Sequence, residues 1–102
     1  MKKSKNSGIE RYKEKLLSII VEVLPECKVY LFGSRARRDY DTGADIDLAL
    51  DMGKEIAREK IYLIKEKMEE TTIPLTVDIV DLYSASEQLQ KDVKKEGILW
   101  KN

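Results

Sequence analysis

Residues 31–50 read LFGSRARRDYDTGADIDLAL and place a glycine–serine pair and an Asp-x-Asp motif between two apolar runs. The run over residues 28–32 (KVYLF) is short, β-branched and aromatic, and it ends at Gly33, so it predicts a strand followed by a turn. Residues 39–44 (DYDTGA) have turn composition. Residues 45–51 alternate apolar and polar side chains, which predicts a second strand. The stretch therefore predicts two strands that follow closely along the chain.

Hydrophobic periodicity and turn signals predict the remaining elements. Helices are expected over residues 7–24, 54–70 and 84–97, a short helix over residues 34–38, and a third strand over residues 75–80. Ser84 and Glu87 form a capping-box pattern, so we expect Ser84 to cap the last helix. The apolar residues 98–100 are expected to pack back on the domain. The order predicts a small α+β (α/β-like) domain with a three-stranded mixed sheet and helices packed on one face.

Composition narrows the class of protein. A chain of 102 residues, 42% hydrophobic and 37% charged, is typical of one globular domain. Its 19 basic and 19 acidic residues cancel, so the overall charge does not support a nucleic-acid partner. The absence of histidine and the single Cys27 exclude an internal disulfide, the usual zinc sites and histidine-based catalysis. We expect Cys27 to be a partly buried small residue rather than a nucleophile.

The start of the chain, MKKSKNSG, is basic but is not followed by an apolar segment, which argues against a signal peptide. No apolar run approaches the length of a membrane span, so no membrane partner is expected. We expect a single cytoplasmic domain over residues 1–102, with residues 1–7 disordered. Because so short a chain buries only a modest fraction of its surface, a homo- or hetero-oligomer is compatible with it.

Three aspartates form the candidate catalytic and metal-binding set. Asp45 and Asp47 are two apart on a strand, so both carboxylates emerge on one face, where a cation would neutralise them. Asp78 alternates with apolar neighbours in LTVDIV and reaches the same face if the second and third strands are adjacent. Three carboxylates suit two Mg²⁺ ions, one for the attacking oxygen and one for the leaving pyrophosphate. Asp51 and Asp81 are expected to be solvated or capping groups.

Gly33 and Ser34 form the candidate phosphate site. A glycine at a strand end, followed by a helix start, exposes backbone N–H groups and a serine hydroxyl to an anion. Arg35, Arg37 and Arg38 follow at once, and at least one of them is expected to contact a triphosphate or the acceptor. Taken singly, each motif is more often a turn or a solvated face. The combination in one predicted topology favours nucleotidyl transfer.

The pair Gly33-Ser34, ten intervening residues, Asp45-x-Asp47 and then Asp78 in VDIVDL resemble the nucleotidyltransferase superfamily of DNA polymerase beta type. More narrowly, they resemble its minimal nucleotidyltransferases (MNT), the MntA-like antitoxins, over almost the whole chain. The resemblance implies that Gly33 and Ser34 bind the triphosphate of ATP. It also implies that Asp45, Asp47 and Asp78 hold two magnesium ions, and that Asp78 helps activate the acceptor hydroxyl.

The resemblance also implies a partner, an all-helical HEPN ribonuclease toxin, which such antitoxins neutralise by transferring AMP from ATP to a tyrosine. Two positions depart from the family pattern: Arg38 stands where glycine is frequent, and Ala44 stands where serine is frequent. Neither departure removes a ligand, so we expect an active protein adenylyltransferase. Two alternatives stay open, a non-catalytic antitoxin that occludes its toxin, and nucleotidyl transfer to a small molecule such as an aminoglycoside.

Overall fold

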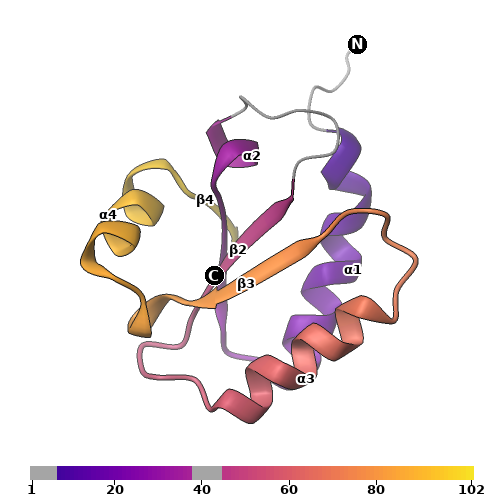
Figure 1. The fold of residues 1–102 in the computed structure, drawn as a ribbon, viewed down its shortest axis with the longest axis horizontal. Helices are drawn as coiled ribbons and strands as arrows, with labels where there is room; N and C mark the ends of the chain where they lie inside the picture. The colour runs from indigo at the N-terminus through magenta and orange to yellow at the C-terminus, as the bar shows by residue number, and fades with distance from the viewer. Residues whose placement is uncertain (1–6, 38–44) are drawn as a thin grey trace.

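The computed structural model describes residues 7–37 and 45–102 and arranges them around one sheet (Figure 1). The elements in chain order are α1 (Ser7–Val23), β1 (Lys28–Phe32), α2 (Ser34–Arg37), β2 (Ile46–Asp51), α3 (Arg58–Glu69), β3 (Val77–Asp81), the 3-10 helix η1 (Leu82–Ser84), α4 (Glu87–Glu96) and β4 (Ile98–Lys101). The turn predicted over residues 39–44 lies outside the described residues. So does the predicted disorder of residues 1–7, except at Ser7, where α1 begins.

The sheet is mixed and its strands lie in the order β3-β2-β1-β4. Strand β1 runs antiparallel to both β2 and β4, whereas β3 is parallel to β2, and α3 forms the connection between these two parallel strands. The predicted α+β class and mixed sheet are confirmed, but the sheet has four strands rather than three. The fourth comes from Ile98–Lys101, which pairs with β1. A segment of only four residues shows too little alternation to predict a strand. Its strand conformation depends on pairing with β1, which the local sequence does not reveal.

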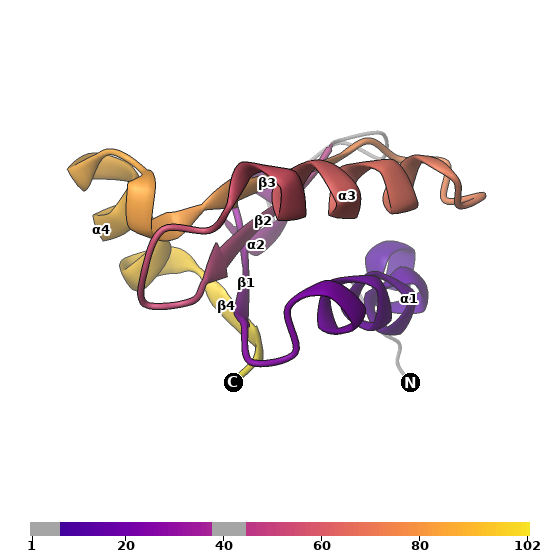
Figure 2. The same ribbon diagram turned by 90° about the horizontal axis from the view of Figure 1, so that it is seen from below.

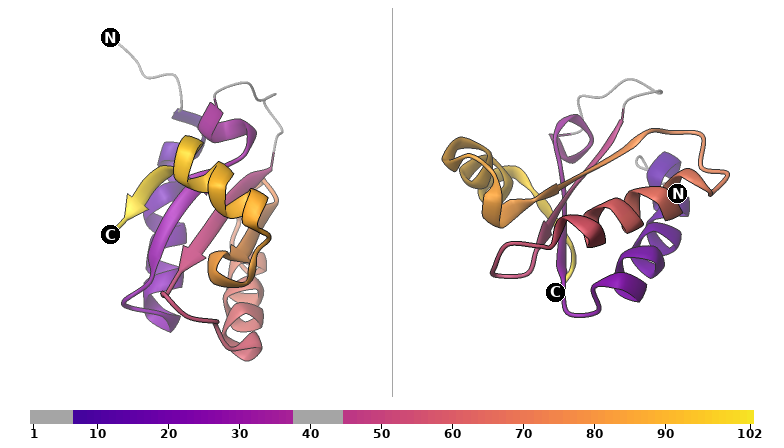
Figure 3. Two further views of the ribbon diagram at one scale, coloured as in Figure 1. Left: turned by 90° about the vertical axis from the view of Figure 1, so that its left-hand side faces the viewer. Right: turned by 60° about the horizontal axis from the view of Figure 1, so that its bottom comes forward.

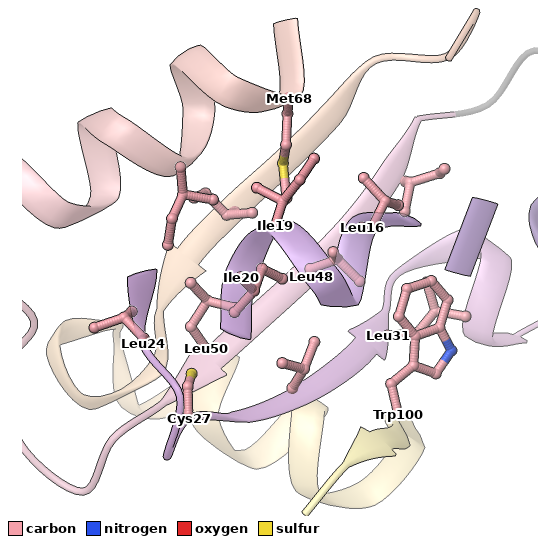
Figure 4. Packing of buried hydrophobic residues seen from close by; sticks show 14 of the residues in the cluster. Leu16, Ile19, Ile20, Leu24, Cys27, Leu31, Leu48, Leu50, Met68 and Trp100 are labelled. Carbon is pink, nitrogen blue, oxygen red and sulfur yellow. The ribbon is translucent and has the colours of Figure 1, made fainter. Parts of the chain in front are cut away.

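The larger core lies between the sheet and the helices α1 and α3 (Figures 2 and 4). Alternate residues of β2 enter it, and Ile46, Leu48 and Leu50 are fully buried there. These side chains meet the apolar stripe of α1, including the fully buried Leu16 and Ile20. This packing fixes which face of β2 is apolar, and so directs the side chains between these positions to the opposite face.

Helix α4 lies on that opposite face, so the prediction that the helices pack on one face is corrected (Figure 3). Its Val93 packs with Ala49 and Leu82 in a separate, smaller cluster. As predicted, Leu89 and Val93 turn towards the sheet, but they meet this second cluster. Tyr30, Phe32 and Val80 of the sheet pack against this cluster, so α4 covers the part of the sheet around Ala49.

Two helix starts differ from the prediction. The N-cap of α4 is Ser86, whose Oγ accepts a hydrogen bond from the Leu89 N–H at 3.1 Å. Ser84 instead belongs to η1 and donates its hydroxyl to Asp81 at 3.0 Å, because the chain makes an extra turn before α4 begins. Helix α3 begins only at Arg58, after a loop that contains Gly53 at φ +76°. None of the helices within residues 7–37 and 45–102 has the length and apolar character needed to cross a bilayer.

Candidate active site

The register of the two parallel strands places Asp47 of β2 directly opposite Asp78 of β3. Because paired residues on neighbouring strands point to the same side, both carboxylates emerge side by side on the face away from α1 and α3. Asp45 precedes β2 by one residue and is exposed. The structure thus brings Asp47 and Asp78 together as strand alternation predicts, while the catalytic and metal-binding roles of the three aspartates stay predictions.

Gly33 lies against this carboxylate face. It follows Phe32, which pairs with Asp47 across the β1–β2 ladder, and it has a φ of +77°. A Cβ atom added at Gly33 would collide with Oδ2 of Asp47, so the Asp47 carboxylate would have to move, and the positive φ independently favours glycine. Helix α2 begins at the next residue, Ser34, and the N–H of Ala36 returns to the carbonyl of Gly33 at 3.1 Å. The predicted phosphate turn and the carboxylates therefore meet at one end of the sheet.

Arg35 and Arg37, the two arginines predicted to bind the nucleotide, both belong to α2, and Arg35 is buried. Arg35 is only 3% exposed and takes part in an interaction within the fold. A buried guanidinium is stable only when it is paired and hydrogen-bonded, so Arg35 is held in place rather than belonging to a solvated cationic surface. Arg37 ends α2, and its contact with a triphosphate stays a prediction, as does that of Arg35. Arg38 lies outside the described residues.

The donor chemistry of the three aspartates suits magnesium. In the described part of the chain, no three acidic, histidine or cysteine side chains already stand close enough to form a metal cluster. The adjacent carboxylates of Asp47 and Asp78 nevertheless leave like charges side by side, and a divalent cation would offset that repulsion. Carboxylate oxygens are also the ligands that Mg²⁺ prefers. The residues present therefore fit the predicted metal.

The other aspartates of β2 and β3, Asp51 and Asp81, cap backbone groups, one of the two roles predicted for them. Asp51 accepts a hydrogen bond from the Gly53 N–H at 2.8 Å. Asp81 caps η1 and also accepts from the Ile56 N–H at 2.9 Å, which ties the loop after β2 to the end of β3. Both carboxylates thus hold the backbone at the end of the sheet opposite to Asp45.

Cys27 is fully buried in the larger core and donates its Sγ–H to the carbonyl of Lys28 at 3.1 Å (Figure 4). Burial raises the pKa of this thiol to about 11, because the thiolate would lose its solvation. A thiol that stays protonated near neutral pH is a poor nucleophile. Cys27 is a small residue packed in the core, as expected, but it is fully rather than partly buried.

Sequence reasoning missed a pocket of about 440 Å³ beside Asp78. Lys65 and Met68 of α3 line one side of this pocket, and Leu75 and Thr76 line the other. Thr76 could have been found, because it stands two residues before Asp78 and alternation places it on the same side. The contribution of α3 could not, since it depends on how that helix packs against β3.

Comparison with known proteins decides the family. The sequence model of the family described as polymerase beta, nucleotidyltransferase, matches residues 14–101. The chain belongs to the polymerase beta nucleotidyltransferase family. The match includes both halves of the site, the Gly33–Ser34 turn and all three aspartates.

Similar proteins point to the MntA-like branch of these nucleotidyltransferases. A probable protein adenylyltransferase MntA from Haemophilus influenzae is 28% identical over 81 residues, which cover 76% of this chain and 68% of that one. A solved toxin–antitoxin complex with AMP-PNP has a TM-score of 0.73 and 26% identity, covering 86% of this chain and 71% of that one. A complex of an MNT antitoxin with a tri-AMPylated HEPN toxin from Shewanella oneidensis has a TM-score of 0.69 and 25% identity, covering 89% and 70%. The predicted resemblance to MntA-like nucleotidyltransferases is confirmed.

Proposed function

We propose that this nucleotidyltransferase uses magnesium and ATP to transfer AMP to a hydroxyl of a HEPN-type toxin, and so acts as its antitoxin. The observation that carries the proposal is the direct pairing of Asp47 with Asp78, with the backbone of Gly33 against the Asp47 carboxylate. Few structural roles call for two adjacent aspartates beside a glycine that must approach them closely. Metal-assisted nucleotidyl transfer calls for both.

In the proposed mechanism, Gly33 and Ser34 bind the triphosphate through backbone N–H groups and the serine hydroxyl, and Arg35 and Arg37 add positive charge. Asp45, Asp47 and Asp78 would hold two magnesium ions, which would neutralise phosphate charge. Asp78 accepts the proton of the acceptor hydroxyl. The acceptor oxygen bonds to the α-phosphorus, the bond from that phosphorus to the bridging oxygen breaks, and pyrophosphate leaves with the electron pair.

The partner is proposed from the relatives. One similar complex contains an MNT antitoxin with a tri-AMPylated HEPN toxin, and the curated relative is named a probable protein adenylyltransferase. Both point to a protein acceptor rather than to a small molecule. The nucleotide is proposed to be ATP because another similar complex contains AMP-PNP, an analogue of ATP.

The test is transfer of label from α-³²P-ATP to a HEPN-type toxin in the presence of Mg²⁺. We expect the wild type to label the toxin and the Asp45→Asn/Asp47→Asn double variant to lose at least about 10³-fold in rate. Asp51→Asn is the matched control, since Asp51 lies on the same face of β2, and it should keep nearly full activity. Absence of label with the wild type, or equal labelling by the double variant, would contradict the proposal. Full toxin neutralisation in cells by the double variant would favour occlusion instead.

A further inference from the structure

Helix α2 carries Ser34 and lies directly after Gly33, at the end of the sheet where β1 ends (Figure 1). It has only four residues, whereas helices shorter than about 12 residues are marginal in water without support from the rest of a protein. The hydrogen bond from the Ala36 N–H to the Gly33 carbonyl, at 3.1 Å, is local, so it does not fix the helix relative to the sheet. The position of the turn therefore depends on the side chains of α2.

Two neighbouring side chains anchor α2. Ala36 is half-buried and packs against the larger core. Arg35 is 3% exposed, and within residues 7–37 and 45–102 it is the only charged side chain that is buried. It also takes part in an interaction within the fold. Because alanine offers only one methyl group to the core, we assign most of the anchoring to Arg35.

The burial of Arg35 distinguishes anchoring from contact with a nucleotide. An arginine that binds a phosphate directly presents its planar fork of N–H donors to the ligand. With 3% of its surface exposed, Arg35 has little to offer to a ligand that arrives from solvent. A buried guanidinium is also costly unless it is paired and hydrogen-bonded, which commits its donors to partners inside the fold.

We propose that Arg35 is a positioning residue for nucleotidyl transfer and not a phosphate ligand. Its buried guanidinium holds α2 in place, and so fixes the backbone of Gly33 and the hydroxyl of Ser34 where they bind the triphosphate. Its charge acts on the phosphates from within the fold, without direct contact. The inference rests on the proposed function, which supplies the triphosphate, and adds the residue that holds the triphosphate-binding turn.

Arginine suits this role better than lysine. Its planar guanidinium has five N–H donors and is more weakly hydrated than an ammonium group, so it bonds to several acceptors inside a fold at a lower cost of burial. Lysine keeps the charge, and it binds phosphate well as a point charge when it reaches the ligand. Substitution of Arg35 by lysine therefore separates the two roles, because it preserves the charge but not the shape or the donors.

The first measurement is the affinity for α,β-methylene-ATP with Mg²⁺ by isothermal titration calorimetry, since the methylene bridge of this analogue prevents transfer. We expect Arg35→Lys and Arg35→Met each to weaken binding about tenfold or more, because small displacements of binding groups are costly. Arg58→Lys and Arg58→Met are the matched controls, since Arg58 is exposed and begins α3 after the loop at the other end of β2. They should stay within about twofold of the wild type. Wild-type affinity in Arg35→Lys would overturn the proposal, and together with weak binding in Arg35→Met it would make Arg35 a phosphate ligand.

The second measurement, amide hydrogen exchange without nucleotide, separates a local role from a general loss of stability. In Arg35→Lys the Ala36 amide should exchange about tenfold faster or more, because its bond to Gly33 loses support, whereas the Leu48 amide of the inner strand β2 should change less than about threefold. An unchanged Ala36 amide would overturn the proposal. So would equal acceleration of both amides, or an Arg35→Lys variant that does not fold, because Arg35 would then support the fold as a whole. If the wild type labels no protein acceptor, the proposed function fails, and the exchange rates still decide whether Arg35 holds the turn.

Discussion

The two faces of the sheet differ in what covers them, and β2 contributes to both. On one face Ile46, Leu48 and Leu50 are fully buried under α1 and α3. On the other, Asp47 and Asp51 are only half-buried, with Ala49 between them beneath α4 (Figure 3). Six consecutive residues thus serve two environments, because successive side chains of a strand point to opposite sides.

From this difference we infer that the residues that stabilise the fold and the proposed catalytic residues are separated by face of the sheet rather than by region of the chain. The covered face is closed by α1 and α3, whereas on the other face α4 contributes one buried residue, Val93, to a smaller cluster with Ala49 and Leu82. The end of the sheet that carries Asp45, Asp47 and Asp78 is where we propose that the nucleotide and the acceptor bind. If the separation holds, neighbouring substitutions should have effects of different kinds.

The largest expected effect is on activity, at the open face. Asp78→Asn keeps the size of the side chain but removes its charge and its ability to accept a proton, so we expect the rate of AMP transfer to fall about 10²- to 10⁴-fold. The melting temperature should hardly change, because Asp78 is exposed. The measurement is single-turnover labelling from α-³²P-ATP, with circular dichroism melts run in parallel. A loss of activity that follows unfolding would break the separation.

The next effect is on stability, at the covered face. Leu48→Ala removes a fully buried side chain one position along from Asp47, and should lower the free energy of unfolding by about 2–5 kcal/mol. Activity per folded molecule should stay within about threefold of the wild type, because the backbone of β2 keeps its pairing. Urea denaturation gives the first quantity, and transfer rates at a temperature where the variant is folded give the second. A change below 1 kcal/mol would show that the apolar face is less tightly packed than its burial indicates.

Much of this organisation could be predicted from the sequence, where local signals agree with the tertiary structure. The strand over residues 28–32 and the positions of Asp47 and Asp78 on one face followed from alternation, which survives folding because it reflects burial. Ser7 to Val23 likewise matches the predicted first helix closely, since its apolar stripe is long and regular.

What could not be predicted depends on contacts between distant segments. Ile98–Lys101 becomes a strand only by pairing with β1, and the pocket beside Asp78 exists only because α3 packs next to β3. The collision that a side chain at Gly33 would make likewise involves Asp47, fourteen residues later in the sequence. The N-cap of α4 was ambiguous for a different reason. Both Ser84 and Ser86 suit an N-cap, and only the extra turn of η1 decides between them.

Asp81→Asn tests whether an aspartate on β3 can matter for the fold alone. Its carboxylate accepts from the N–H groups of Ile56 and Tyr83 and from the hydroxyl of Ser84, three bonds that an amide can satisfy only in part. We expect the free energy of unfolding to fall by about 1–3 kcal/mol. Transfer by the folded variant should stay close to that of the wild type, in contrast to Asp78→Asn three residues earlier. Urea denaturation and transfer assays measure the two, and a loss of transfer without a loss of stability would assign Asp81 to the site.

The smallest expected effect concerns protonation within the covered face, at Cys27. Burial raises the pKa of its thiol from 9.0 to about 11, so as the pH rises the unfolded chain loses this proton first. The protonated thiol therefore contributes its full share of the free energy of unfolding below pH 9, and this share is lost as the pH rises towards 11. At pH 10 the loss is about 1 kcal/mol. Urea denaturation of the wild type and of Cys27→Ala between pH 7 and pH 10 measures it, and other titrating groups cancel in the difference. Because the variant has no thiol, its free energy of unfolding should fall less steeply with pH than that of the wild type. Parallel curves would mean that the core does not hold the thiol protonated. The two faces of the sheet would then differ less in polarity than their side chains suggest.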